Sequence, residues 1–481
     1  MSSDRHVKIA QLKDVGSFRE RLDELGLSIP CDEAIVTAGD SSPMAEPIKI
    51  GEFEVGNRWC IHPMEGWDAN VDGLPTEKTL RRWRRFGLSG AKLIWGGEAA
   101  AVQSDGRANP NQMLAIPENE SGLAALLDEL QQAHRERFST TDDLLVGLQL
   151  THSGRFCRPN SKKLEPRIAF HHPLLDEKFG IDPHDDSMVW TTGELWDLIE
   201  SYVAAAQTAQ RAGYAFVDIK SCHGYLLHEF LSARSRGDDF GNSYEGRTRL
   251  LKTIVQRVAA ECPGLMIVVR LSFFDTPPFV TSQEMGRPMD YAHLLPYRYG
   301  FGCCEDDPME MDLREPLQLV GELERLGVVS VNLSCASPYY NPHLMRPAAF
   351  PPSDGYRPPE DPLVSVARQI QAVRRCKEAH PGLPLVGTGY TYLQEYLPHV
   401  AQAVVRAGWV DLVGLGRMVL SYPELPADTL QEGRMNRKSI CRTFSDCTTA
   451  PRNGLVSGCF PLDPYYKQLP QAQELKVIKQ K

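Results

Sequence analysis

Short runs of apolar residues alternate with amphipathic stretches of helical period along most of the chain. Apolar runs of this length are typical of strands buried on both faces of a parallel sheet. Their alternation with helical stretches is the signature of β/α units. The eight runs are RWCIHPM (58–64), AKLIWGG (91–97), LLVGLQL (144–150), FVDIK (216–220), MIVVRLS (266–272), VVSVNLS (328–334), LVGTG (385–389) and DLVGLG (411–416).

Helix signals occur between these runs. TEKTLRRWRRFG begins at the capping residue Thr76 and ends at Gly87. A longer stretch begins with a capping box, Thr191 with Glu194, and ends at Gly213. REPLQLVGELERLG, VARQIQAVRRCKEAH and LPHVAQAVVRAG continue the alternation. Strands that are each followed by a helix predict an α/β fold, a single (β/α)₈ TIM barrel. A doubly wound open sheet is the alternative, but it rarely has eight strands in so even a rhythm.

The pattern divides the chain into three parts. Residues 1–45 form an N-terminal extension, residues 46–435 the barrel, and residues 436–481 a short C-terminal tail. Two long insertions, 273–312 and 335–361, follow the fifth and sixth predicted strands. Barrels place their active sites on these βα loops, so we expect both insertions to cover a pocket. The alternative is that they are decorative or contact another subunit.

Composition and charge exclude several classes of partner. The 481 residues are 42% hydrophobic and carry a net charge of −10, which disfavours binding to nucleic acid or to an anionic membrane. The start, MSSDRHVKIAQLKD, has no apolar leader, and no run is long enough to span a bilayer. The twelve cysteines are scattered, as in a reduced chain. We therefore expect a cytoplasmic protein, and the sequence leaves open whether it is a homo-oligomer.

Glycines end the last two predicted strands, where barrels often bind a phosphate. The sequences there are Gly387-Thr388-Gly389-Tyr390 and Gly414-Leu415-Gly416-Arg417. Glycine allows backbone N–H groups to approach an anion, and arginine adds a charge-assisted contact. The spacing therefore predicts a phosphate site at these two strand ends.

The fourth strand and its loop read DIKSCHGYLLHEFLSARSRGDDFGNSYEGRTRLL. This segment resembles the Old Yellow Enzyme family, in its NADH:flavin oxidoreductase / 2,4-dienoyl-CoA reductase-like branch. NRWCIHPMEG, LLVGLQLTHSGR, VVRLS, LVGTG and DLVGLGRMVL follow the family's order, over roughly residues 46–430. The resemblance implies a TIM barrel with FMN across its C-terminal mouth and NADH or NADPH as the reductant.

The same resemblance implies which residues bind FMN. Gln149 would contact the pyrimidine edge of the flavin, and Arg270 would stabilise the anion of the reduced ring. Glycines and Arg417 at the last two strand ends would hold the phosphate, in agreement with the spacing argument. The full implied set is Pro63, Met64, Glu65, Gly97, Ala99, Gln149, Arg270, Gly389, Tyr390, Gly416 and Arg417.

The family's substrate site falls here on Lys220, His223 and Tyr225. The resemblance implies that Lys220 and His223 would bind the carbonyl oxygen of an α,β-unsaturated substrate. Tyr225 would protonate the α-carbon as general acid. These three residues are the predicted catalytic set.

Two residues depart from the family's pattern at this site. Lys220 stands where the family normally has histidine, and Glu65 where it commonly has threonine or cysteine. Lysine donates hydrogen bonds and carries a compact positive charge, so it suits an anionic substrate group and puts the usual range of simple enones in question. The two insertions suggest an aromatic or bulky substrate. An interaction between Lys220 and Glu65 would reconcile both changes.

The tail is a third departure. Larger members of this branch carry a four-cysteine iron–sulfur motif there, whereas Cys441, Cys447 and Cys459 remain here, with Phe444 where a fourth cysteine would stand. We therefore expect no iron–sulfur cluster, no other metal and no FAD.

Four functional hypotheses follow. The preferred one is an FMN-dependent NAD(P)H oxidoreductase, an ene-reductase that acts on a small molecule. The second is an FMN-dependent oxidase, dehydrogenase or demethylase that acts on an amine or alicyclic substrate. The third is a non-redox phosphate-binding lyase that uses Lys220 as a Schiff-base nucleophile. The fourth is an inactive protein that retains FMN. The sequence does not discriminate NADH from NADPH.

Overall fold

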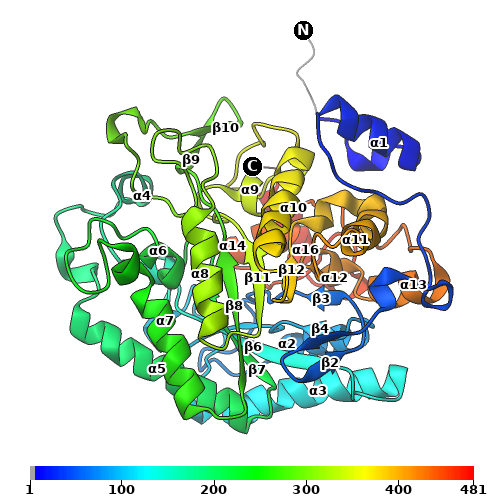
Figure 1. Cartoon of the computed structure of the whole chain (residues 1–481), viewed down its shortest axis with the longest axis horizontal. Helices are drawn as coiled ribbons and strands as arrows, with labels where there is room; N and C mark the ends of the chain where they lie inside the picture. The colour runs from blue at the N-terminus through cyan, green and yellow to red at the C-terminus, as the bar shows by residue number, and fades with distance from the viewer. Residues whose placement is uncertain (1–5, 481) are drawn as a thin grey trace.

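A closed barrel of eight parallel strands forms the centre of the molecule (Figure 1). The structure is a computed structural model that describes residues 6–480. Pairing of the last barrel strand with the first, and of the second with the third, closes the ring. The barrel strands are β3 (Trp59–Ile61), β4 (Leu93–Ile94), β6 (Leu145–Thr151), β7 (Phe216–Ser221), β8 (Met266–Ser272), β11 (Ser330–Ser334), β12 (Leu385–Gly387) and β13 (Leu412–Leu415). All eight predicted strands and the TIM-barrel fold are confirmed.

A major helix follows each barrel strand and packs on the outside of the ring. The capping box of Thr191 and Glu194 begins the third of these helices, as predicted. The eight helices are α2 (Glu77–Gly87), α3 (Glu120–Phe138), α5 (Thr192–Arg211), α7 (Tyr244–Glu261), α8 (Arg314–Arg325), α10 (Pro362–Ala379), α11 (Leu397–Arg406) and α13 (Leu425–Glu432).

The N-terminal extension packs against the barrel. In helix α1 (Val15–Glu24), Phe18 stacks on Tyr396 with ring centroids 4.3 Å apart, and Arg21 forms a 2.7 Å ion pair with Asp361. After the extension, at the start of the barrel segment, the hairpin of β1 (Ile48–Ile50) and β2 (Phe53–Val55) packs against the side chains at the N-terminal end of the barrel. The extension is thus a structural part of the domain.

The two insertions differ in what they cover. Residues 335–361, with helix α9 (Pro342–Met345), line the main pocket, as expected. Residues 273–312, with the hairpin of β9 (Phe279–Ser282) and β10 (Met285–Pro288), contribute none of its lining residues. They line a separate internal cavity with Asp275, Thr276 and Tyr299. The additional strand β5 (Ala99–Ala101) and helices α4 (Pro173–Phe179), α6 (Leu226–Phe230) and α12 (Met418–Ser421) lie in other loops.

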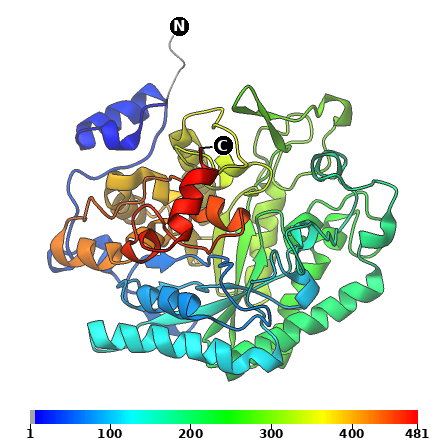
Figure 2. The same ribbon diagram turned by 180° about the vertical axis from the view of Figure 1, so that it is seen from behind.

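The C-terminal tail folds back over the mouth of the barrel (Figure 2). It contains helices α14 (Asp446–Arg452), α15 (Pro464–Lys467) and α16 (Gln471–Ile478). Asp463 anchors it by ion pairs to Arg81 at 2.9 Å and Arg85 at 2.7 Å, both on α2. The tail is therefore one wall of the pocket.

Residues 6–480 contain neither a disulfide bond nor a helix that could span a membrane. The twelve cysteines are all free thiols. Within residues 6–480, no group of three or more His, Cys, Asp or Glu side chains has the arrangement of a metal site. No helix in the same range combines the length and apolar character needed to cross a membrane.

Gly414 on β13 is required by the buried ring of His62. A Cβ atom at this glycine would lie 2.0 Å from His62 Cε1. We expect Gly414→Ala to lower the free energy of unfolding by about 1–3 kcal/mol, because overpacking forces side chains and backbone to shift. Chemical denaturation measures this. Gly416→Ala is the matched control, since nothing lies within 4 Å of its added Cβ. Equal effects of the two substitutions would contradict the prediction.

Candidate active site

A deep pocket opens at the C-terminal ends of the barrel strands, between the 335–361 insertion and the tail. Strand ends contribute most of its floor, and the insertion and the tail contribute its walls. It brings together most of the residues predicted from the sequence. Those that line it are Pro63, Met64, Glu65, Gln149, Lys220, His223, Tyr225, Arg270, Gly389, Gly416 and Arg417.

Three predicted residues lie outside the pocket lining. Ala99 belongs to β5 and pairs with Gln149, and a Cβ at Gly97 would meet the indole of Trp83 at 2.7 Å. The Tyr390 ring packs beneath the strand end, where its hydroxyl would lie 3.0 Å from a Cβ at Gly387. Roles of Gly97, Ala99 and Tyr390 in cofactor binding stay predictions.

Asp218 positions two of the predicted cofactor residues. Its Oδ2 accepts a 2.6 Å hydrogen bond from the amide of Gln149, and its Oδ1 accepts a 2.7 Å bond from the backbone N–H of Arg270. Burial raises the pKa of this carboxyl to about 6. Neighbouring strands β6, β7 and β8 supply the three residues, so strand pairing alone brings them together.

Glu65 is the centre of a second cluster. Its Oε2 accepts a 2.7 Å hydrogen bond from the Tyr225 hydroxyl and lies 3.8 Å from Lys220 Nζ. The indole N–H of Trp67 donates to Oε1 at 2.9 Å. The interaction of Lys220 with Glu65 inferred from the sequence is therefore present. A residue that the sequence did not single out, Tyr339, adds its hydroxyl 3.0 Å from that of Tyr225.

Burial shifts the titration of the catalytic candidates. It raises the pKa of Tyr225 well above its ordinary range, and the adjacent Glu65 carboxylate adds to this shift. It lowers the pKa of Lys220, against the opposing attraction of Glu65. It also lowers the pKa of His223, with Arg270 as the next cause. At neutral pH the tyrosine is therefore a neutral phenol and the histidine a neutral imidazole.

His223 is held in a constrained conformation. Its φ of +66° is left-handed, which a non-glycine residue adopts only when the surroundings enforce it. Its backbone N–H donates to Ser272 Oγ at 3.0 Å, and Nε2 lies 2.8 Å from Ser334 Oγ. Two neighbouring strands, β8 and β11, thus fix the orientation of this ring.

Comparison with known proteins identifies the family. The sequence model described as the NADH:flavin oxidoreductase / NADH oxidase family matches residues 43–288, just over half of the 481. The chain belongs to this family. The resemblance found in the sequence is confirmed, and so is its cofactor class, FMN with a nicotinamide nucleotide.

Curated relatives are distant. An NADH oxidase of Thermoanaerobacter brockii is 24% identical over 396 residues, which is 82% of this chain and 51% of the relative. The 12-oxophytodienoate reductase 1 of Oryza sativa subsp. japonica is 24% identical over 416 residues, 84% of this chain and 90% of the relative. A solved complex of 2-naphthoyl-CoA reductase with 2-naphthoyl-CoA shares the fold. Its TM-score is 0.65 at 17% identity, with 88% of this chain and 57% of that chain covered. The chain thus spans about half the length of the NADH oxidase.

Charges in this flavoprotein-family pocket fit a cofactor with two anionic ends. Eight cationic side chains line it, and five of them form ion pairs with carboxylates. Among the described residues, the remaining three, Arg270, Arg346 and Arg417, form none. Nε of Arg270 and Nη1 of Arg417 are buried without a hydrogen-bond partner. Unpaired buried guanidinium groups are costly unless an anion compensates them, so the residues present fit FMN.

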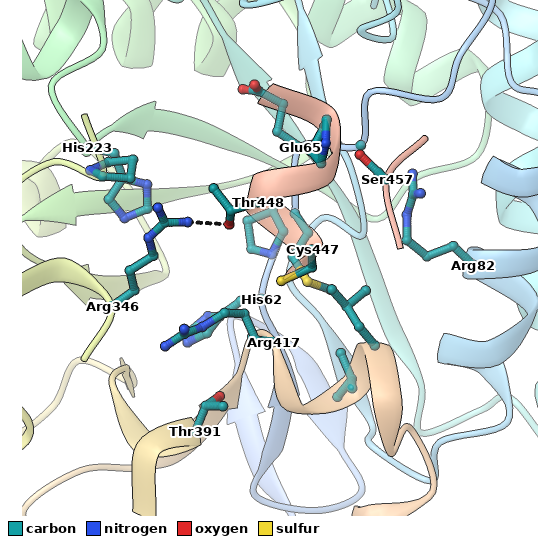
Figure 3. Close-up of a pocket in the computed structure, with 18 of the residues that line it drawn as sticks. His62, Glu65, Arg82, His223, Arg346, Thr391, Arg417, Cys447, Thr448 and Ser457 are labelled. Atoms are coloured by element: carbon teal, nitrogen blue, oxygen red, sulfur yellow. Dashed lines mark hydrogen bonds between the residues drawn. The ribbon is translucent and has the colours of Figure 1, made fainter. Parts of the chain in front are cut away.

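Several lining residues were not predicted from the sequence. Arg346 comes from the 335–361 insertion and Thr448 from the tail, and Figure 3 shows Arg346 pointing toward Thr448 across the pocket. Arg452, Thr391 and Tyr339 were also missed. A signal existed for Tyr339, Arg346 and Thr391, because each lies in a loop that follows a barrel strand.

Proposed function

We propose that this chain is an FMN-dependent oxidoreductase that passes hydride from NADH or NADPH to an activated C=C bond of a small carbonyl compound. The observation that carries the proposal is the Tyr225 hydroxyl, buried in the pocket wall between Glu65 and Tyr339. Its raised pKa keeps the proton on the phenol. A reduction that leaves negative charge on the α-carbon needs such a proton donor.

Cofactor binding is assigned to residues of the pocket floor. Gln149 and Arg270 would face the flavin ring, and Gly389, Gly416 and Arg417 its phosphate. FMN, when bound, supplies hydride transfer between the nicotinamide and the substrate. The protein's own part is to hold the ring against Arg270, whose positive charge favours the anionic reduced form.

Activation of the substrate is assigned to Lys220 and His223. Lys220 Nζ lies 3.8 Å from the Tyr225 ring centroid and is buried, so it sits beside the proposed proton donor. A lysine there donates to a carbonyl oxygen and stabilises the charge that develops on it. The Tyr339 ring stacks on Phe156 at 4.1 Å, which forms an aromatic wall. This combination favours an aromatic-derived or anionic carbonyl substrate.

Proton return to Tyr225 is assigned to its two hydrogen-bonded neighbours. Tyr225 donates to Glu65, and Tyr339 can donate to Tyr225, so a phenol that has lost its proton has a neighbour on each side. Lys220 lies within 3.8 Å of Glu65 and limits the build-up of negative charge there. These residues therefore support repeated proton donation.

A second candidate, oxidation of an amine or alicyclic substrate, has one observation in its favour. Glu65 Oε2, 2.7 Å from the Tyr225 hydroxyl, offers a carboxylate that can receive a proton removed from a substrate. The lyase hypothesis loses support, because it gives no role to Gln149 or Arg270 and because the chain belongs to a flavin-dependent family.

An anaerobic titration followed by visible absorption tests the proposal. We expect the flavin absorption near ~450 nm to bleach stoichiometrically with NADH or NADPH and to return when an enone, an enoyl thioester or an unsaturated acid is added. Flavin that bleaches only with an amine would instead favour the oxidative reaction. A protein that binds FMN but is reduced by none of these would contradict both candidates.

A further inference from the structure

Two arginines at the phosphate end of the pocket stand out because they have no carboxylate partner among the described residues. Arg417 follows β13 and donates through Nη2 to the Pro347 carbonyl at 2.7 Å, which leaves its buried Nη1 without a partner. Arg346 lies next to Pro347 in the chain, and its buried Nη2 also lacks a partner. The two guanidinium groups therefore line the same pocket, each with an unused N–H group.

The setting of Arg346 is electrostatically unfavourable without an anion. Burial is the largest cause that lowers its pKa to about 9, and the like charges of Arg452 and Arg417 contribute to the same shift. Arg452 is neutralised by Asp354, whose carboxylate it contacts at 2.6 Å and 2.7 Å. Nothing comparable neutralises Arg346 among residues 6–480. A ligand with two negative charges would offset both free guanidinium groups.

The C-terminal tail fixes the orientation of Arg346. Nη1 of Arg346 donates to Thr448 Oγ1 at 2.5 Å, as the dashed line in Figure 3 shows. Thr448 lies on α14, so the tail reaches across the mouth to hold a residue of the 335–361 insertion. Thr391 also lines this part of the pocket, and nothing lies within 4 Å of a Cβ placed at Gly416. There is therefore open space beside the backbone that precedes Arg417.

We propose that Arg346 and Arg417 together clamp the phosphate of FMN, with Thr448 of the tail as the positioning residue for Arg346. Glycines at the ends of β12 and β13 then form only one side of the phosphate site. The insertion and the tail close the other side. The proposal rests on the FMN cofactor class of the family and is independent of the reaction proposed above.

Paired affinities for FMN and riboflavin test the clamp. Riboflavin has the same ring system without the phosphate. Its affinity therefore depends on the other contacts of the flavin and not on the proposed contacts to the phosphate. We expect Arg346→Met in the full chain to weaken FMN binding about 10- to 100-fold, the usual effect of losing a charge-assisted contact. Riboflavin affinity should stay unchanged. Flavin fluorescence quenching, measured on protein freed of its flavin, gives both dissociation constants.

Matched variants make the test specific. Arg452→Met removes a neighbouring cation that already has its carboxylate, so it should change FMN affinity much less. Thr448→Val should weaken FMN binding selectively, and Thr448→Ser should restore it. Equal losses for FMN and riboflavin, or an unchanged FMN affinity in Arg346→Met, would overturn the clamp. Wild-type protein that binds FMN but catalyses no reduction would refute the proposed reaction and leave the clamp standing.

Discussion

Replacing Tyr225 with phenylalanine is expected to slow substrate reduction by about 10²- to 10⁴-fold, the usual contribution of a positioned general acid. The substitution removes only a hydroxyl, and the ring keeps its place near Phe156 and Tyr339. The variant should bind FMN normally and be reduced by NADH or NADPH at the wild-type rate, because neither process needs this proton. Stopped-flow absorption near ~450 nm measures the two half-reactions separately.

Tyr339→Phe is the matched control for this prediction. It removes the hydroxyl 3.0 Å from that of Tyr225 but leaves the hydrogen bond to Glu65. We expect a smaller loss, confined to the step that consumes substrate. If Tyr225→Phe reduced the substrate at the wild-type rate, Tyr225 would not be the proton donor. If it slowed flavin reduction as strongly, its role would be structural.

The barrel and most of the pocket floor could be predicted because their signals are local. Each strand is a short apolar run, and the polar residue at its carboxyl end is read directly from the sequence. Because the strands of a closed barrel are parallel, all their carboxyl ends lie on the same face of the barrel. Gln149, Lys220 and Arg270 therefore line one pocket, although 121 positions separate the first from the last. The Lys220–Glu65 interaction was predictable because each of these two charges needs a partner of opposite sign at the same mouth.

The walls of the pocket could not be predicted in this way. Arg346 and Thr448 meet although they lie 102 positions apart, and neither belongs to a periodic segment. The tail gave no sequence signal of its path across the mouth, because its three helices are short and are held by single side chains such as Asp463. Contacts of this kind depend on tertiary packing, which an apolar pattern does not encode.

Replacing Arg270 with methionine is expected to slow reduction of the bound flavin by NAD(P)H by about 10²- to 10³-fold, the cost of losing one preorganised group that stabilises developing negative charge. Arg270 is buried and has no ion-pair partner among the described residues, and its Nη1 reaches only the Pro63 carbonyl at 3.5 Å. Methionine has a similar length and no charge. The backbone bond from residue 270 to Asp218 does not depend on the side chain.

Two comparisons separate this electrostatic effect from a packing defect. Arg270→Lys keeps a positive charge in the same strand and should be reduced at a rate between those of wild type and Arg270→Met. Removing an unpaired buried charge should not lower the thermal stability of the flavin-free protein, because the desolvation cost of the guanidinium disappears with it. If Arg270→Met bound FMN stoichiometrically and its flavin were reduced at the wild-type rate, the charge of Arg270 would not stabilise the reduced flavin. A large drop in thermal stability would mean that Arg270 is a structural residue of the barrel.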